Sequence, residues 1–197
     1  MRKHVLSLTA AAVALGVAPA VAVAQSETRP SVDRYTVAGA LGGVSGGTEL
    51  NEGGAADWQP GWAASVDATY WLHRYLGVRA GAGWAQDSIS GASVAGRGRF
   101  NKFTYDASVV VRYPMQAGSG TLSPYAVGGG GGVAVHQLGS DSTWTKPAGN
   151  FGFGVEYRLK RFGLRAEGRD FVYSFDRYGI DRTQHDVAWQ GGVTLSF

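Results

Sequence analysis

The stretch Asp186–Phe197, with the sequence DVAWQGGVTLSF, alternates strictly between two kinds of residue. One set is apolar or glycine: Val187, Trp189, Gly191, Val193, Leu195 and Phe197. The other set is small or polar: Asp186, Ala188, Gln190, Gly192, Thr194 and Ser196. Successive side chains of a β-strand point to opposite faces, so this period of two predicts a strand with one apolar and one polar face.

The same alternation recurs throughout the chain from residue 35 onward. Seven further stretches carry it: 35–44, 62–72, 76–84, 103–113, 125–135, 150–159 and 162–173. In 125–135 we expect the apolar face to hold Tyr125, Val127, Val133 and Val135. Each stretch has about 10 to 12 residues, which exceeds the usual soluble strand and matches the length that crosses a bilayer at a tilt.

The predicted connections differ in length in a regular way. His73–Arg74 and Lys160–Arg161 are tight turns, whereas 114–122 is longer than a tight turn requires. Long segments rich in Gly, Ser and Asp cover 45–61, 86–102, 137–149 and 174–185. Short turns on one rim and long loops on the other are typical of membrane barrels. We therefore predict an all-β fold, a transmembrane eight-stranded antiparallel up-and-down β-barrel, with both termini on the rim of short turns.

Composition excludes several classes of protein. The 197 residues include 31 Gly and no Cys. This glycine content disfavours a helical bundle, and the absence of Cys excludes a disulfide scaffold and a thiol nucleophile. A soluble lipocalin-like barrel would alternate in the same way. However, the second face here holds Arg, Glu, Asp, Thr and Ser, a composition that suits a crowded polar lumen better than a solvent face.

The N-terminal region has the features of a targeting segment. Residues 1–24 combine a basic start, a short Ala/Val/Leu run and a small-x-small sequence ending at Ala24, which predicts a cleaved signal peptide. A retained membrane helix is the alternative, although the run is Ala-rich and short for a span. Residues 25–34 would then form a short periplasmic segment, and 35–197 the barrel. The formal charge of +3 falls to about +1 without the leader, so nucleic acid is not expected as a partner.

The polar face carries charges that a narrow barrel would enclose. An eight-stranded barrel has an interior that its own side chains fill, and buried charges need partners. We expect a structural network inside the lumen formed by Asp67, Arg79, Asp106, Arg112, Glu156, Arg158, Arg165, Glu167 and Arg169. A gated ion path or proton relay is the alternative role. Asp170 breaks the pattern, because strict alternation directs it at lipid unless the strand bulges before it or it lies near the outer rim.

Aromatic residues gather near both ends of the predicted strands. Their positions predict two membrane-interface belts, formed by Trp62, Tyr70, Trp84, Phe103, Tyr113, Phe151, Tyr157 and Phe162. Amphipathic rings favour these heights in a bilayer.

The chain resembles the eight-stranded outer-membrane β-barrel family that includes the OmpA transmembrane domain, OmpX/Ail-type proteins and OmpW. The resemblance rests on the leader, on Gly154–Leu159 followed after a two-residue turn by Leu164–Glu167, and on the terminal Val193–Phe197. It implies location in the bacterial outer membrane and insertion by the outer-membrane assembly machinery. That machinery would recognise the C-terminal strand and Phe197.

Function is less determined than fold. We expect a non-enzymatic barrel with a structural or adhesive surface-loop role and a side-chain-filled lumen; a narrow conduit for small or hydrophobic solutes is the alternative. A lipid-modifying enzyme is disfavoured because barrel deacylases use a His-x-Ser motif, and neither His136 nor His185 has a serine two residues later. We expect no cofactor and no metal. The expected partners are outer-membrane lipids and a surface ligand bound through the long loops, and no oligomer is required.

Overall fold

The computed structural model describes residues 33–46, 56–91, 98–137, 143–177 and 180–197. All of these lie in one unit, Val32–Phe197. The strands are β1 Tyr35–Gly46, β2 Ala56–His73, β3 Leu76–Gly91, β4 Gly98–Arg112, β5 Met115–Ala117, β6 Gly120–Gln137, β7 Thr143–Leu159, β8 Phe162–Arg177 and β9 Ile180–Ser196. No helix among the described residues is long and apolar enough to cross a membrane.

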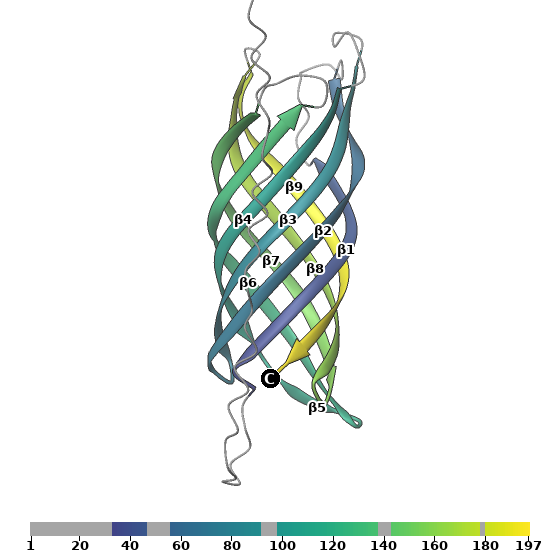
Figure 1. Ribbon diagram of the computed structural model, residues 1–197, viewed down its shortest axis with the longest axis vertical. Helices are drawn as coiled ribbons and strands as arrows, with labels where there is room; N and C mark the ends of the chain where they lie inside the picture. The colour runs from purple at the N-terminus through teal and green to yellow at the C-terminus, as the bar shows by residue number, and fades with distance from the viewer. Residues whose placement is uncertain (1–32, 47–55, 92–97, 138–142, 178–179) are drawn as a thin grey trace, which may run out of the picture. The chain divides into compact units, whose positions relative to one another are not determined.

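The strands form a closed ring (Figure 1). Neighbours along the chain pair antiparallel, β1 pairs with β9, and β4 pairs with β6. β5 is a short extra strand that pairs only with the first residues of β6 and extends the β4–β6 connection beyond the barrel. The eight long strands therefore confirm the predicted up-and-down barrel. Closure gives each of the eight long strands a partner on both sides, which a membrane-spanning sheet needs because lipid offers no hydrogen-bond partners.

The two faces of the wall differ sharply in exposure. In β9, Trp189 is 67% exposed and Val193 63%, whereas Thr194 is 2% and Ser196 0%. The predicted faces of the C-terminal strand are thus confirmed. Large apolar side chains cover the outside, and the inside is buried and mostly polar. This inverted distribution fits a wall whose outer surface meets hydrocarbon rather than water.

The strands are longer than predicted, and one turn is displaced. We expected long connections at 45–61, 86–102, 137–149 and 174–185, but strand pairing continues into all four segments. Polar residues still satisfy a hydrogen-bonded ladder, so loss of the apolar pattern does not end a strand. The turn expected at His73–Arg74 lies at Arg74–Tyr75, because a register shift between Trp71 and His73 carries β2 further. The predicted turn at Lys160–Arg161 is confirmed.

The orientation expected for the glycine-rich strand β6 is wrong. Tyr125, Val127, Val133 and Val135 are 0–8% exposed and face the lumen. The register with β4 explains this, since Gly131 lies opposite the buried Asp106, and directly paired residues point to the same side. Between residues 126 and 134, the outward positions of β6 are left with Gly and Ala only. There the ring of Tyr105, from β4, covers Gly132.

Candidate functional site

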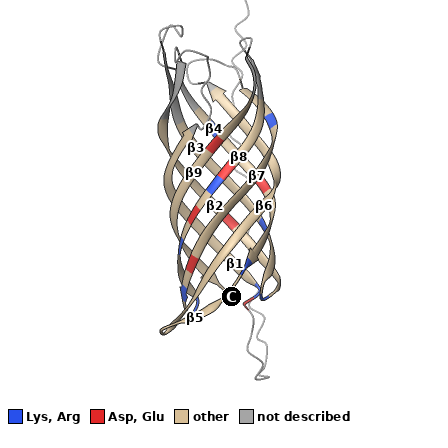
Figure 2. Cartoon of the chain, turned by 180° about the vertical axis from the view of Figure 1, so that it is seen from behind, with Lys and Arg blue, Asp and Glu red and all other residues tan. Residues whose placement is uncertain are grey.

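The lumen is filled by side chains from all around the barrel, and Figure 2 shows acidic and basic positions close together along its strands. At the turn end, an aromatic and hydroxyl cluster forms its floor. The indole Nε1 of Trp71 donates to Thr36 Oγ1 at 3.0 Å, and Thr36 Oγ1 lies 3.0 Å from Ser196 Oγ. The guanidinium of Arg112 stacks over the Trp71 ring at 3.4 Å, and its Nε donates to the carbonyl of Arg74 at 3.0 Å. Trp71 and Arg112 therefore close the lumen at this end.

Above the floor lies a four-charge cluster, formed by Asp67 of β2, Arg79 of β3, and Arg165 and Glu167 of β8. Arg79 Nη1 donates to Glu167 Oε2 at 2.6 Å, and Arg79 Nε lies 3.5 Å from Asp67 Oδ1. Arg165 binds both carboxylate oxygens of Asp67 through its two terminal nitrogens. The Tyr125 hydroxyl also donates to Glu167 Oε2, at 2.6 Å. The two acids and two bases balance in charge, which is the condition for ion pairs this deeply buried.

A second ion pair, between Arg169 and Asp106, lies nearer the loop end. Arg169 Nη2 bonds Asp106 Oδ2 at 2.5 Å, Asn150 Oδ1 at 2.8 Å and Ser108 Oγ at 2.9 Å. These contacts join β8 to β4 and β7. Arg169 is 9% exposed, so its charge is enclosed by partners rather than by water.

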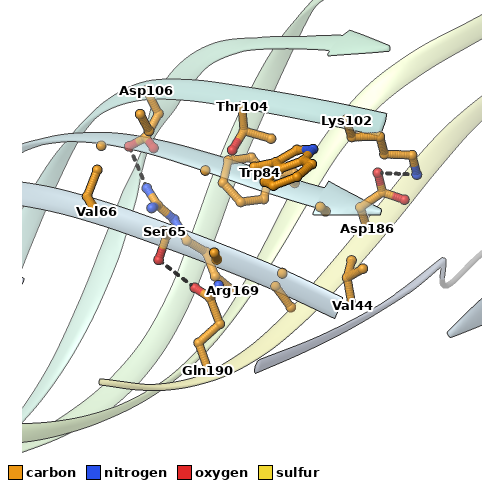
Figure 3. A pocket seen from close by; sticks show the side chains of 18 of the residues that line it. Val44, Ser65, Val66, Trp84, Lys102, Thr104, Asp106, Arg169, Asp186 and Gln190 are labelled. Atoms are coloured by element: carbon orange, nitrogen blue, oxygen red, sulfur yellow. Dashed lines mark hydrogen bonds and ion pairs between the residues drawn. The ribbon is translucent and has the colours of Figure 1, made fainter. Parts of the chain in front are cut away.

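A third ion pair joins β4 to β9. Lys102 Nζ donates to Asp186 Oδ2 at 2.8 Å, and the Tyr173 hydroxyl donates to the same oxygen at 2.9 Å. In Figure 3 the Arg169–Asp106 and Lys102–Asp186 pairs bracket a small space in the lumen, with the Ser65–Gln190 hydrogen bond at its side. That space measures about 50 Å³ and accommodates water-sized occupants only.

Two members of the predicted network, Glu156 and Arg158, lie outside the ion pairs described above. Glu156 and Arg158 of β7 flank the β7–β8 turn with Arg165 and Glu167 of β8, and Glu156 is in register with Arg165. However, the guanidinium of Arg165 reaches across to Asp67. Arg158 lies near the turn end and bonds Asp33 at 3.2 Å. Glu156 is buried but takes part in none of the ion pairs of the described residues.

Several lumen residues were missed by the sequence reasoning. Lys102 fell in a segment expected to be a loop, although it continues the parity of Thr104 and Asp106. Asp186 was placed on the polar face but was not included in the charge network. Tyr125 was assigned to the wrong face. Extending each alternating pattern by two residues would have found Lys102, whereas Tyr125 needed the register of β6 against β4.

The predicted interface aromatics all lie on the outside of the wall. Near the loop end, Trp62 and Trp84 pack edge to face with ring centroids 4.8 Å apart. Phe103 and Phe151 lie there too, half exposed. Nearer the turns are Tyr113 at 64% and Phe162 at 71% exposure, together with the partly exposed Tyr70 and Tyr157. Phe197 is 51% exposed, with its ring 5.9 Å from that of Tyr35.

Asp170 lies on the outer side of the wall, beside His185. Its Oδ2 is 2.7 Å from His185 Nδ1, and its other carboxylate oxygen is buried without a hydrogen-bond partner. The β8–β9 ladder has no register shift, so no bulge precedes Asp170. Its cross-strand neighbours are Phe151 and Val187, in the loop half of the barrel. The imidazole therefore partners a carboxylate that would otherwise face lipid alone.

The described residues contain no group of three or more His, Cys, Asp or Glu side chains that could hold a metal ion. Apart from Glu156, most lumen charges of the described residues are paired with one another. Two described hydroxyls lie beside a base: Ser108 donates to Asp106 Oδ2 at 2.7 Å, and Thr143 Oγ1 lies 2.9 Å from His136 Nδ1. Chemically, the arrangement is suited to holding the barrel closed.

Comparisons with known proteins find a matching family and several similar structures. The family described as "Outer membrane protein beta-barrel domain" matches residues 8–197. The structure resembles Neisserial surface protein A, with a TM-score of 0.62, 16% identity, and coverage of 83% of this chain and 97% of that one. It also resembles outer membrane protein AlkL, with a TM-score of 0.50, 17% identity, and coverage of 88% and 95%. The N-terminal barrel of Pseudomonas aeruginosa OprF gives a TM-score of 0.48 at 15% identity, covering 84% and 98%. No curated protein matches the chain.

Proposed function

The chain belongs to the outer membrane protein β-barrel family, and we propose that its barrel is a closed, non-conducting, non-enzymatic anchor for surface-exposed connections that contact a ligand outside the cell. As an eight-stranded outer-membrane barrel it lies with its short turns towards the periplasm.

The single observation that carries the proposal is the four-charge cluster across the lumen. Its members come from β2 and β3 on one side and β8 on the other, and the Arg79 guanidinium lies 2.6 Å from Glu167 Oε2 and 3.5 Å from Asp67 Oδ1. Side-chain exposure is 4–5% for Asp67, Arg79, Arg165 and Glu167. Guanidinium and carboxylate groups held this way fill the cross-section, and separating them would expose unpaired charge in a low-dielectric interior. This supports occlusion rather than passage.

Conductance in a planar bilayer tests the proposal. The wild-type barrel should give no discrete current steps. Removing both members of an upper pair, Arg169→Ala with Asp106→Ala, widens the lumen without leaving an unpaired charge, but the four-charge cluster below still blocks it. This variant should therefore be silent as well. Stepwise currents from the wild type would overturn the anchor proposal and favour a narrow conduit.

Processing and assembly form part of the same proposal. Residues 1–24 would be removed as a signal peptide, 25–34 would remain in the periplasm, and the β9 strand ending in Phe197 would be recognised during insertion. The intact mass of the protein purified from outer membranes tests the first point. A mass that includes residues 1–24 would contradict it. Since the eight long strands are each paired on both sides, we expect that an oligomer is not needed for stability.

A further inference from the structure

A hollow on the outer wall at the turn end has the character of a lipid site. It is shallow and wide open to the outside, with a volume of about 540 Å³. Its lining includes Val111, Ala126 and Phe153, which face outward from β4, β6 and β7. Tyr75 and Tyr113 stand at its edge, with stacked rings 6.2 Å apart. We name this hollow the periplasmic groove.

A cation, Arg74, stands beside Tyr75 at the edge of the periplasmic groove. The Arg74 guanidinium lies over the Tyr75 ring, 4.6 Å from its centroid, and the His73 ring lies 5.4 Å from the same centroid. The carbonyls of Arg74 and Tyr75 accept hydrogen bonds from Arg112, which fixes this turn to the barrel. Arg74 is therefore an exposed cation on a pinned backbone, directed at an aromatic surface.

The charge around this edge is not compensated by acidic side chains. At the turn end, Arg34, Arg74, Lys160 and Arg161 are exposed and take part in none of the ion pairs of the described residues. Asp33, at the same end, already forms an ion pair with Arg158, whose Nη1 lies 3.2 Å from Asp33 Oδ2. An anion on Arg74 would therefore meet no competing carboxylate partner. Guanidinium groups bind phosphate oxygens well, in paired hydrogen bonds.

From these features we propose that the periplasmic groove binds one anionic glycerophospholipid of the periplasmic leaflet. Its phosphate contacts Arg74, and an acyl chain lies along Val111, Ala126 and Phe153. The hollow alone would suit any acyl chain, and the cation at its edge supplies the preference for negative charge. A second wall hollow, of about 660 Å³, is lined by Leu41, Val66 and Trp84 among others and by no charged residue. The lining of the periplasmic groove instead includes Tyr75, over whose ring Arg74 lies, so we expect the preference at the periplasmic groove only.

The proposal rests on the membrane placement of the barrel and not on its closed lumen. Lipid retention and conductance can therefore fail independently. The full chain folded in mixed micelles would be titrated with phosphatidylglycerol or phosphatidylcholine, and bound lipid counted by native mass spectrometry. The wild type should retain one phosphatidylglycerol, with an affinity about fivefold above that for phosphatidylcholine, the preference expected from one cation near the headgroup.

Three variants separate this specific site from general attraction. Arg74→Ser should abolish the preference for phosphatidylglycerol. Ala126→Trp should fill the groove and reduce retention of both lipids, with Ala126→Leu as a milder version if folding suffers. The matched control, Arg161→Ser, removes an exposed cation from the β7–β8 turn, which β4 and β6 separate from the β2–β3 turn that carries Arg74, and it should leave the preference for phosphatidylglycerol unchanged. Equal retention of both lipids by the wild type, or an equal loss in Arg161→Ser and Arg74→Ser, would overturn the proposal.

Discussion

Replacing Glu167 with alanine removes one of the two acids of the four-charge cluster. Arg79 then loses its 2.6 Å contact, and Tyr125 loses the acceptor of its hydroxyl. Asp67 remains as the only carboxylate for both Arg79 and Arg165, so the cluster carries an uncompensated positive charge. Breaking a buried pair by removing one partner typically lowers the free energy of unfolding by about 3–5 kcal/mol. We expect a loss of that size, which is a large share of the stability of an ordinary domain.

The assay is urea unfolding of the barrel in lipid vesicles, followed by tryptophan fluorescence and by the electrophoretic mobility of the unboiled protein. Two controls separate charge from volume. Glu167→Gln keeps the shape and an acceptor oxygen, so it reports the charge. The double variant Glu167→Leu with Arg79→Leu removes a neutral pair and leaves Arg165 with Asp67. It should lose far less stability than Glu167→Ala, since replacing both partners by apolar groups is often close to neutral.

The refuting result is specific. If Glu167→Ala unfolds within about 1 kcal/mol of the wild type, the buried cluster does not stabilise the barrel as its geometry implies. If the double variant loses as much as the single one, the loss comes from packing and not from the unpaired charge.

Three further predictions concern other parts of the wall. Gly131→Ala should prevent folding, because its Cβ would lie 2.7 Å from the Cα of Asp106 on β4. Gly130→Ala makes only an ordinary 3.7 Å contact and should fold. The refolding yield on unboiled gels measures both variants, and equal yields would contradict the argument. His185→Leu leaves the Asp170 carboxylate without its imidazole partner and should lower the free energy of unfolding by about 1–3 kcal/mol. Asp170→Leu removes a charge from the lipid side and should be neutral or stabilising in the same urea assay. A larger loss of stability in Asp170→Leu than in His185→Leu would be inconsistent with the pairing. Phe197→Ser should reduce insertion into the outer membrane of cells while leaving refolding in detergent unchanged, and loss of both would assign Phe197 a purely structural role.

The period of two in the sequence was sufficient to predict the barrel. Trp189, Val193 and Leu195 face outward and Thr194 and Ser196 inward because neighbouring residues of a strand cannot share a face. The same rule failed at β6, where glycine and alanine occupy one face and hydrophobicity alone directed Tyr125 and Val127 to lipid. Strand ends were also misplaced, since the polar residues beyond the apolar stretches continue the ladder.

The sequence could not predict which charged side chains pair with one another inside the lumen. Arg165 is in register with Glu156 on the adjacent strand, and a local argument pairs them. In the closed barrel its guanidinium reaches Asp67 instead, and Glu167 likewise bonds Arg79. The alternation of residue types was enough to locate the eight long strands and, for most of them, to identify the side chains that point inward. Ring closure alone decided which inward charges meet, because it brings β2 and β3 opposite β8 across a lumen narrow enough for long side chains to span.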